Sequence, residues 1–284
     1  MVTTYTLQHP APDGGPGNSS TVVSPHPIEV AEACRLAAEA VDGIAPSLVL
    51  QNTLDYPQPL ADSTQGVQAI ATKYVGCSRC HLSSRRTFVC NLKGDPNATV
   101  ACVGDGPTRD DNERGTPFVG PAGRLQDELF REFGIDPFSL AWLNLVGCRP
   151  CEYAVWAANR PPTRIEMLAC SERTWGLLSA VRPRVVVCLG KEATALFWDK
   201  PPPVWTWHRV IPPDAPDDWV MVGHARHPAY LARVIGMPSN YKEYASARTF
   251  YSALSGQMAS LSKTVAWRFG LRYLNGFTKP EAGR

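Results

Sequence analysis

The chain has 284 residues, 44% of them hydrophobic, which is enough for one sizeable core plus appendages. No apolar run is long enough to span a membrane, and residues 1–12 lack the basic and apolar regions of a secretory signal, so we expect a cytoplasmic protein with no membrane partner. Nine cysteines, an odd number at uneven spacings, indicate thiols and metal ligands rather than a disulfide framework in such a chain.

The formal net charge of +2 is unevenly distributed along the chain. Residues 1–70 contain one basic and seven acidic residues, whereas residues 71–284 contain the other 27 basic and 19 acidic residues. A basic body behind an acidic front favours a polyanionic partner for the body, although a normally soluble surface would have the same composition.

The first 65 residues have the composition of an N-terminal extension. Residues 1–27 are rich in Pro, Gly, Ser and Thr, so we expect them to form no packed core. The apolar spacing over residues 28–41 suits one helix, and residues 45–62 are typical of a linker. We therefore predict that residues 1–65 are partly disordered and contain a single candidate helix.

A Cys-x-x-Cys pair, Cys77 and Cys80, follows a helix predicted over residues 66–75. The pair lies in a basic setting. Taken alone, it fits half of a zinc site, a redox pair or a coincidence of spacing.

The most informative stretch runs from the apolar residues 100–103 to a helix that starts at Pro121. Gly104 ends a strand of the length expected for burial on both faces, and a polar loop with one aromatic residue, Phe118, follows. Strand, polar loop and helix in this order are how an open α/β sheet builds a site at the carboxyl end of a strand.

Three further buried strands are predicted over residues 140–146, 184–190 and 219–222. Helices are predicted between and after them, from the Thr163–Glu166 capping box onward, over residues 191–198 and over residues 241–262. The first of these helices should face the core with Ile165, Leu168, Trp175 and Leu178. Strands that alternate with helices predict an α/β fold with a parallel sheet covered on both faces, which we place at residues 66–262, with a tail over residues 263–284.

The stretch around the first strand resembles the first motif of the iron–sulfur (family 4) branch of the uracil-DNA glycosylase superfamily. The residues that match that motif without a gap are Gly104, Pro107, Gly115, Pro117, Phe118, Val119, Gly120, Ala122 and Gly123. The departures are Asp105 in place of Glu, Thr108 in place of Gly and Asn112 in place of Asp. The resemblance implies a three-layer α/β/α fold with a central, mainly parallel four-stranded sheet.

The same resemblance extends the cysteine pair to a set of four. It implies that Cys77, Cys80, Cys148 and Cys170 hold a [4Fe–4S] cluster, for which four thiolates are suitable ligands. Zinc at a four-cysteine site is the alternative, and Cys151 is a competing ligand for Cys148.

The resemblance also implies how a base would be held. Phe118 would stack on a base flipped out of DNA, and Asn144 would read the O4 and N3–H edge of uracil, because a carboxamide both donates and accepts. Gly104 and Gly106 complete the implied base-binding set.

The candidate catalytic residues are His227, which the resemblance implies, and Asp105 and Asp111, which are candidates for the acid. His227 matches the family's second motif, where it would donate to O2 of the departing base. Asp105 is the first candidate to position water or stabilise the cationic sugar, and Asp110 and Asp111 are alternatives.

The residues around His227 are candidates for DNA contact. Arg226 would bind phosphate, with Arg233 nearby, and Tyr230 or Leu231 would fill the gap that the flipped base leaves.

We therefore predict a monomeric, monofunctional DNA glycosylase that acts on uracil or a related pyrimidine in single- or double-stranded DNA. Two alternatives stay open: an enzyme of antiviral defence that removes C5-modified bases from phage DNA, since Asp105 and Thr108 alter the motif, and a non-catalytic protein of the same fold that binds uracil or DNA.

Overall fold

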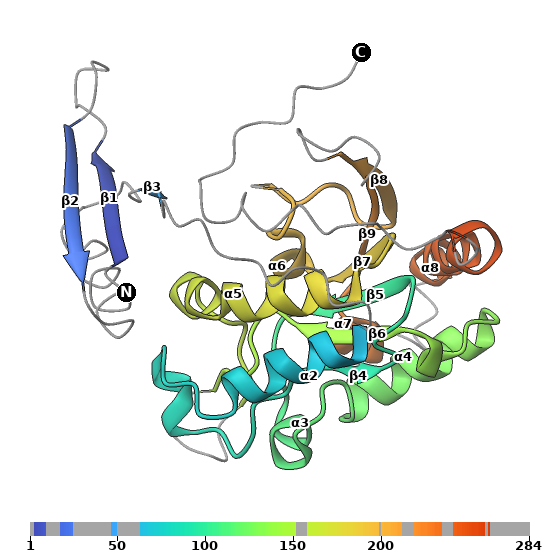
Figure 1. Ribbon diagram of the computed structural model, residues 1–284. Coiled ribbons are helices and arrows are strands. Elements are labelled where there is room, and N and C mark those ends of the chain that lie inside the picture. Colours follow the sequence, from blue (N-terminus) through green and yellow to red (C-terminus); the bar gives the residue numbers. More distant parts are fainter. Residues whose placement is uncertain are drawn as a thin grey trace.

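The computed structural model describes residues 3–9, 18–24, 47–49, 63–151, 158–198, 200–211, 219–234, 241–258 and 261 (Figure 1). The helix predicted over residues 28–41 and the tail over residues 263–284 lie outside these residues. Within the described part of the chain, no helix is both long and apolar enough to cross a membrane.

The N-terminal extension contains a small antiparallel sheet of strand order β2-β1-β3. In this sheet β1 (Thr3–His9) pairs with both β2 (Asn18–Ser24) and β3 (Ser47–Val49). No strand was predicted here, because Gly, Pro and Ser dominate the composition. The threonines and valines that form β1 and β2 have a high strand propensity, which the overall composition conceals.

The main sheet has six strands in the order β4-β6-β5-β7-β9-β8. The strands are β4 (Lys93–Gly94), β5 (Val100–Gly104), β6 (Ala141–Asn144), β7 (Val185–Leu189), β8 (Thr206–Val210) and β9 (Val220–Ala225). The central four strands are parallel, and the two edge strands, β4 and β8, pair antiparallel with their neighbours. The four predicted strands are therefore confirmed as the parallel centre, and the predicted strand count of four is corrected to six.

The central strands are buried on both faces, as their continuous apolar runs predict. Every residue of β5, β6 and β7 is buried. The edge strand β8 is only half-buried and contains polar residues, so its sequence lacks the apolar run by which the others were recognised.

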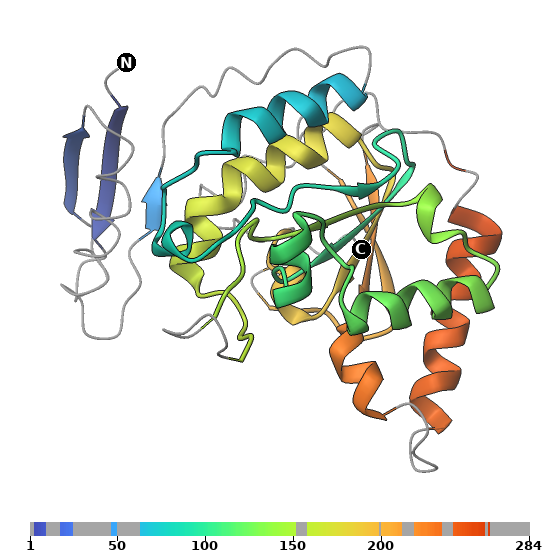
Figure 2. The ribbon, with the colours of Figure 1, turned by 90° about the horizontal axis from the view of Figure 1, so that it is seen from below.

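Helices cover both faces of this sheet and give a three-layer α/β/α arrangement (Figure 2). The helices α5 and α6 contribute to the core on one face, and α2 packs against this core through Val67 and Ile70. The helices α4, α7 and α8 contribute to the core on the other. Their bounds are α2 (Ser63–Tyr74), α3 (Arg109–Arg114), α4 (Pro121–Glu132), α5 (Arg164–Val181), α6 (Lys191–Thr194), α7 (Pro228–Val234) and α8 (Tyr241–Ala253). Short 3-10 turns occupy His81–Ser84 and Pro137–Ser139, and a π-helical turn at Leu254–Met258 follows α8.

Two local details differ from the predictions. The Thr163–Glu166 capping box that starts α5 is confirmed, but Ile165 is 39% exposed and does not face the core. The polar loop after β5 contains α3, a helix that was not predicted. Thr108 caps α3 and Asp111 completes its capping box, a role for which glutamate or glutamine is the usual sequence signal.

Candidate active site at the carboxyl ends of the parallel strands

The carboxyl ends of the four parallel strands meet at one edge of the sheet. Gly104 at the end of β5 pairs with Asn144 at the end of β6, and Leu189 of β7 pairs with Ala225 of β9. This edge is where an open α/β sheet places its ligands. The residues just beyond these strand ends include Asp105, Gly190 and His227.

Gly104 lies against both residues that were predicted to hold a base. A Cβ atom added to Gly104 would lie 2.6 Å from Phe118 Cζ and 2.7 Å from Asn144 Oδ1, so a larger residue would displace both side chains. The structure therefore brings Gly104, Phe118 and Asn144 together. Asn144 is buried, and its backbone carbonyl accepts a hydrogen bond from Arg173 Nη1 at 3.2 Å.

Phe118 has an unusual backbone conformation for a residue with a side chain. Its φ is +57°, in the left-handed region, and strained residues of this kind gather at functional sites. The ring packs on Trp142, with 5.1 Å between ring centroids, and Phe118 is 8% exposed. Phe118 is thus part of the hydrophobic core and also reaches Gly104 with the tip of its ring.

Asp105 has the unsatisfied polar group of this edge. Its Oδ1 atom is buried and has no hydrogen-bond partner among the described residues. The pKa of Asp105 is raised to about 8, chiefly by burial and next by the charge of Glu192, while Lys191 and the backbone N–H of Ala193 act in the opposite direction. A buried acceptor without a donor indicates a place for water or a ligand atom.

His227 lies across Gly190 from Asp105. A Cβ atom added to Gly190 would lie 3.3 Å from His227 Cβ and 3.4 Å from Asp105 Oδ1, and the φ of Gly190, +104°, also requires glycine. The backbone N–H of Ala229 donates to His227 Nδ1 at 3.2 Å. A neutral imidazole that accepts at Nδ1 has its proton on Nε2, so Nε2–H is a hydrogen-bond donor.

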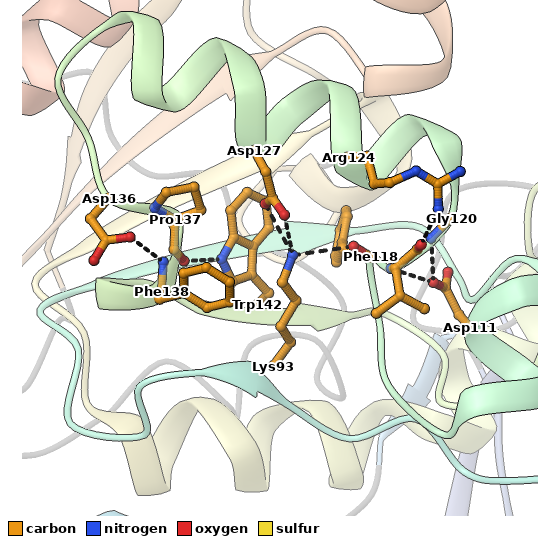
Figure 3. Close-up of polar contacts among 11 residues, drawn as sticks. Lys93, Asp111, Phe118, Gly120, Arg124, Asp127, Asp136, Pro137, Phe138 and Trp142 are labelled. Carbon is orange, nitrogen blue, oxygen red and sulfur yellow. Dashed lines mark hydrogen bonds and ion pairs between the residues drawn. The ribbon is translucent and has the colours of Figure 1, made fainter.

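Asp111 braces the loop after β5, which we call the site loop (residues 105–120). Its Oδ2 accepts from the backbone N–H and hydroxyl of Thr108 at 2.8 and 2.9 Å. Its Oδ1 accepts from the backbone N–H groups of Val119 and Gly120 at 2.7 and 3.2 Å, and these two contacts are drawn in Figure 3. The predicted catalytic role of Asp111 does not fit this position, because four donors already engage both oxygens.

The neighbours of Gly106 and Thr108 decide whether there is additional space for a ligand beside these two residues. A Cβ atom added to Gly106 would lie 2.8 Å from Pro150 Cγ and 3.0 Å from Val146 Cγ2, so neighbouring residues fill this side. Thr108 Oγ1 would lie 2.9 Å from a Cβ atom on Gly120. Thr108 therefore faces α3 and the end of the site loop.

The residues predicted to contact DNA occupy different environments. Arg226 donates from Nε to Glu243 at 2.7 Å and lies over the Tyr230 ring, 4.7 Å from its centroid. Leu231 is 3% exposed and belongs to the core, so its predicted insertion into DNA is corrected, whereas Tyr230 is only partly buried. The side chain of Arg233 lies outside the described residues.

Three of the four predicted ligand cysteines influence one another. Burial raises the pKa of Cys80 to about 12, and the nearby thiols of Cys148 and Cys170 add to this shift. The pKa of Cys148 is also raised, chiefly by burial and next by the charge of the nearby Cys170 thiol. Cys77 is partly buried, and Cys151 is buried and forms an isolated antiparallel β-bridge with Asn159. Within the described residues, no group of three or more His, Cys, Asp or Glu side chains has the arrangement of a metal site.

Arg173 is a functional candidate that the sequence did not reveal. It is 1% exposed, and its guanidinium donates to the carbonyl oxygens of Cys90, Asn91 and Asn144. Its Nη1 also lies 4.0 Å from Cys170 Sγ. Arg173 therefore links the end of β6 to Cys170, and the only sequence signal for this was its position in α5 after Cys170.

The chain matches the sequence profile described as "Uracil DNA glycosylase superfamily" over residues 93–254. A Thermotoga maritima protein named type-4 uracil-DNA glycosylase is 33% identical over 170 residues, which is 59% of this chain and 83% of that protein. Proteins of the same name from Archaeoglobus fulgidus and Sulfurisphaera tokodaii are 31% and 30% identical over 135 residues each. These two alignments cover 48% and 47% of this chain, and 65% and 59% of the two relatives.

Proposed function

Because this chain belongs to the type-4 branch of the uracil-DNA glycosylase superfamily, we propose that it excises uracil from DNA and leaves an abasic site. The enzyme is a hydrolase of N-glycosyl bonds, as its type-4 relatives are. The observation that supports the proposal is the convergence of Asp105, Asn144 and His227 around two glycines, Gly104 and Gly190.

Base binding in this proposal uses the space over Gly104. The flipped uracil stacks against the Phe118 ring, and the Asn144 carboxamide pairs with the O4 and N3–H edge. Since a Cβ atom at Gly104 would collide with both side chains, the glycine keeps them at the distance at which they can share one flat ligand.

Bond cleavage in this proposal depends on charges that appear only as the bond breaks. The electron pair of the C1′–N1 bond moves to the base, and the negative charge that collects on O2 is stabilised by the Nε2–H of His227. The sugar becomes cationic, and the Asp105 carboxylate stabilises it and orients a water molecule through its unpaired Oδ1. Addition of this water to C1′ and loss of its proton complete the hydrolysis.

DNA contact is assigned to the basic body of the chain, where Arg226 and Tyr230 lie beside His227. Arg226 contacts phosphate and Tyr230 fills the vacated position in the stack, while Arg233 is a further candidate for phosphate. We propose that the enzyme acts as a monomer in the cytoplasm.

The cysteine set suits a [4Fe–4S] cluster, as the resemblance to the iron–sulfur branch of the superfamily implies. Two cationic groups adjoin the thiols: Arg173 lies near Cys170 Sγ, and Arg86 Nη1 lies 3.8 Å from Cys148 Sγ. The thiolate ligands of a cluster would neutralise the charges of the buried Arg173 and the partly buried Arg86, whereas neutral thiols would not. We assign Cys77, Cys80, Cys148 and Cys170 as ligands, with Cys151 outside the set.

A bound cluster would supply a rigid cross-link between residues 77–80 and the segment from Cys148 to Cys170, and no electron transfer. Anaerobically purified protein should contain about four irons and four sulfides per chain, as the cluster type requires. One zinc and no sulfide would assign the site to zinc.

The alternative substrates have weaker support in the structure. Thr108 faces α3, and Pro150 and Val146 fill the space beside Gly106, so of the sequence departures only the shorter Asp105 remains an argument for a C5-modified base. A non-catalytic binding role would leave the unpaired Asp105 oxygen without a purpose.

The decisive experiment is single-turnover excision from oligonucleotides that contain uracil, thymine mispairs or C5-modified pyrimidines. We expect cleavage at uracil that depends on His227. Preference for a C5-modified base would support the defence role, and tight binding to uracil-DNA without excision would support the binding module.

A further inference from the structure

A buried ion pair lies beside the site loop. Lys93 of the edge strand β4 directs its Nζ atom at both carboxylate oxygens of Asp127 in α4, at 3.0 and 2.8 Å (Figure 3). The two side chains are only 10% and 13% exposed. A charge pair withdrawn from water is costly to form and adds little stability on balance, so its purpose needs an explanation other than surface solubility.

The same ammonium group contacts the Phe118 region in two ways. Lys93 Nζ donates to the backbone carbonyl of Phe118 at 3.2 Å. It also lies 5.1 Å from the centroid of the Trp142 ring, on which the Phe118 ring packs. Strand pairing places Lys93 opposite Trp142 and so fixes this position. One side chain therefore touches both the backbone of Phe118 and the ring that supports its side chain.

The Phe118 peptide is held in a conformation that it would not adopt unaided. Its positive φ is unfavourable for a residue with a Cβ atom. On one side its carbonyl abuts the first turn of α4, where a Cβ atom added to Gly123 would lie 2.2 Å from Phe118 O. On the other side Lys93 supplies a charge-assisted hydrogen bond to the same oxygen.

The next peptides along the loop are fixed by other side chains. Asp111 accepts from the N–H of Val119 at 2.7 Å, and Arg124 Nη1 donates to the carbonyl of Val119 at 2.8 Å (Figure 3). The Asp111 and Arg124 contacts act one peptide beyond Phe118. Lys93 is thus the side chain that holds the carbonyl of the stacking residue itself.

We propose that Lys93, oriented by Asp127, is a positioning residue that holds the Phe118 ring in place for stacking on the target base. The inference rests on the proposed function, because the base is the ligand that the ring would contact. Asp127 neutralises the ammonium and fixes its direction, so that the donor points at the Phe118 carbonyl and not at water.

The test is a double-mutant cycle on single-turnover excision of uracil. Lys93→Met keeps an apolar stem but removes the donor and the charge, and we expect the rate to fall about tenfold, which corresponds to about 1.4 kcal/mol. Lys93→Arg, which keeps a cationic donor, should recover most of the rate. In a Phe118→Ala background, Lys93→Met should reduce the rate no further, because the ring that it positions is absent.

Two control variants separate positioning from general instability. Val181→Ala removes a buried side chain on the opposite face of the sheet, and its excision rate should equal that of wild type at a temperature where both are folded. Lys73→Met removes the charge from an ion pair between α2 and α5, with Glu172 as partner, and it should also have the wild-type rate.

The outcomes distinguish this inference from the proposed function. Wild-type protein without uracil excision would overturn the proposed function. Active wild-type protein with an unchanged Lys93→Met rate, or with effects of Lys93→Met and Phe118→Ala that simply add, would overturn the positioning role alone. If Lys93→Met does not fold, Asp127→Asn takes its place in the same cycle, because it removes the charge that orients the Lys93 ammonium, and additivity there has the same meaning.

Discussion

Two aspartates at the ends of one short segment, Asp105 and Asp111, have opposite surroundings. Asp111 is buried with four hydrogen-bond donors on its two oxygens. Asp105 is only partly buried, but its Oδ1 atom is buried without a donor among the described residues, and its pKa is raised to about 8 by burial and by Glu192. The loop supplies donors to both oxygens of Asp111, whereas Asp105 Oδ1 has no donor among the described residues.

This contrast separates residues that build the site from residues that act in it. A satisfied buried carboxylate stabilises its loop and has no capacity left for a ligand. An unsatisfied one lowers the stability of the fold, and it persists where function requires it. Resemblance to a motif could not make this distinction, because both residues lie in the same matched stretch.

The largest effect should come from removing the satisfied carboxylate. Asp111→Ala leaves the N–H groups of Thr108, Val119 and Gly120 without their acceptor, and each buried donor without a partner costs about 1–3 kcal/mol. We expect a loss of roughly 3–5 kcal/mol in the free energy of unfolding, measured by urea denaturation. Asp110→Ala is the control and should cost less than about 1 kcal/mol. Equal effects of the two variants would show that Asp111 does not brace the loop.

His227 tests the second class of this comparison, the residues that act in the site. His227→Ala removes a donor whose value is greatest when charge develops on the base, so the single-turnover rate should fall roughly a hundredfold, about 2.7 kcal/mol. Affinity for uracil-DNA should change little. A large loss of affinity with an unchanged rate of cleavage would assign His227 to DNA binding.

Asp105→Asn should stabilise the protein while it slows the reaction. The folded pKa of about 8 lies above the ordinary 3.8, so the fold favours the protonated acid and loses stability as the pH rises from 4 to 8. The amide has no charge to bury, and the variant should therefore gain roughly 2 kcal/mol over wild type at pH 8.5 and less at pH 5. Urea denaturation at both values measures this, and a gain independent of pH would contradict the raised pKa.

The last prediction concerns the pH dependence of wild-type excision. If the carboxylate form of Asp105 is the active one, the single-turnover rate should rise about tenfold per pH unit below pH 8 and level off above it. Asp105→Asn should remove this dependence together with most of the rate. A wild-type rate that is flat between pH 6 and 8 would mean that bound DNA shifts the pKa or that another acid acts.

The centre of the fold could be predicted because its strands have a clear signal in the sequence. The apolar runs of β5, β6, β7 and β9 are continuous, since parallel strands in this fold are covered on both faces. The edge strands could not be predicted in the same way: β4 has two residues, and β8 contains three polar residues among five and follows a proline-rich segment. Pairing with a neighbour forms these strands, and no local pattern encodes that pairing.

The identity of the site residues could be predicted from the sequence, but their burial and their hydrogen-bond partners could not. Phe118, Asn144 and His227 lie in motifs, and the structure places Phe118 and Asn144 side by side over Gly104. The sequence did not show that Leu231 is buried, because an apolar residue after a helix start fits both a core and a DNA wedge. Lys93 escaped notice for a related reason, since its partners lie 25 and 34 residues away.

Arg173 has a consequence for how the molecule opens. Its one guanidinium joins the carbonyls of residues 90–91 to the end of β6 and to helix α5, three segments that are distant in sequence. Separating residues 90–91 from α5 breaks three of these hydrogen bonds, and separating the end of β6 breaks the fourth. Their backbone amides should therefore exchange with deuterium as a single cooperative unit, with one common opening free energy.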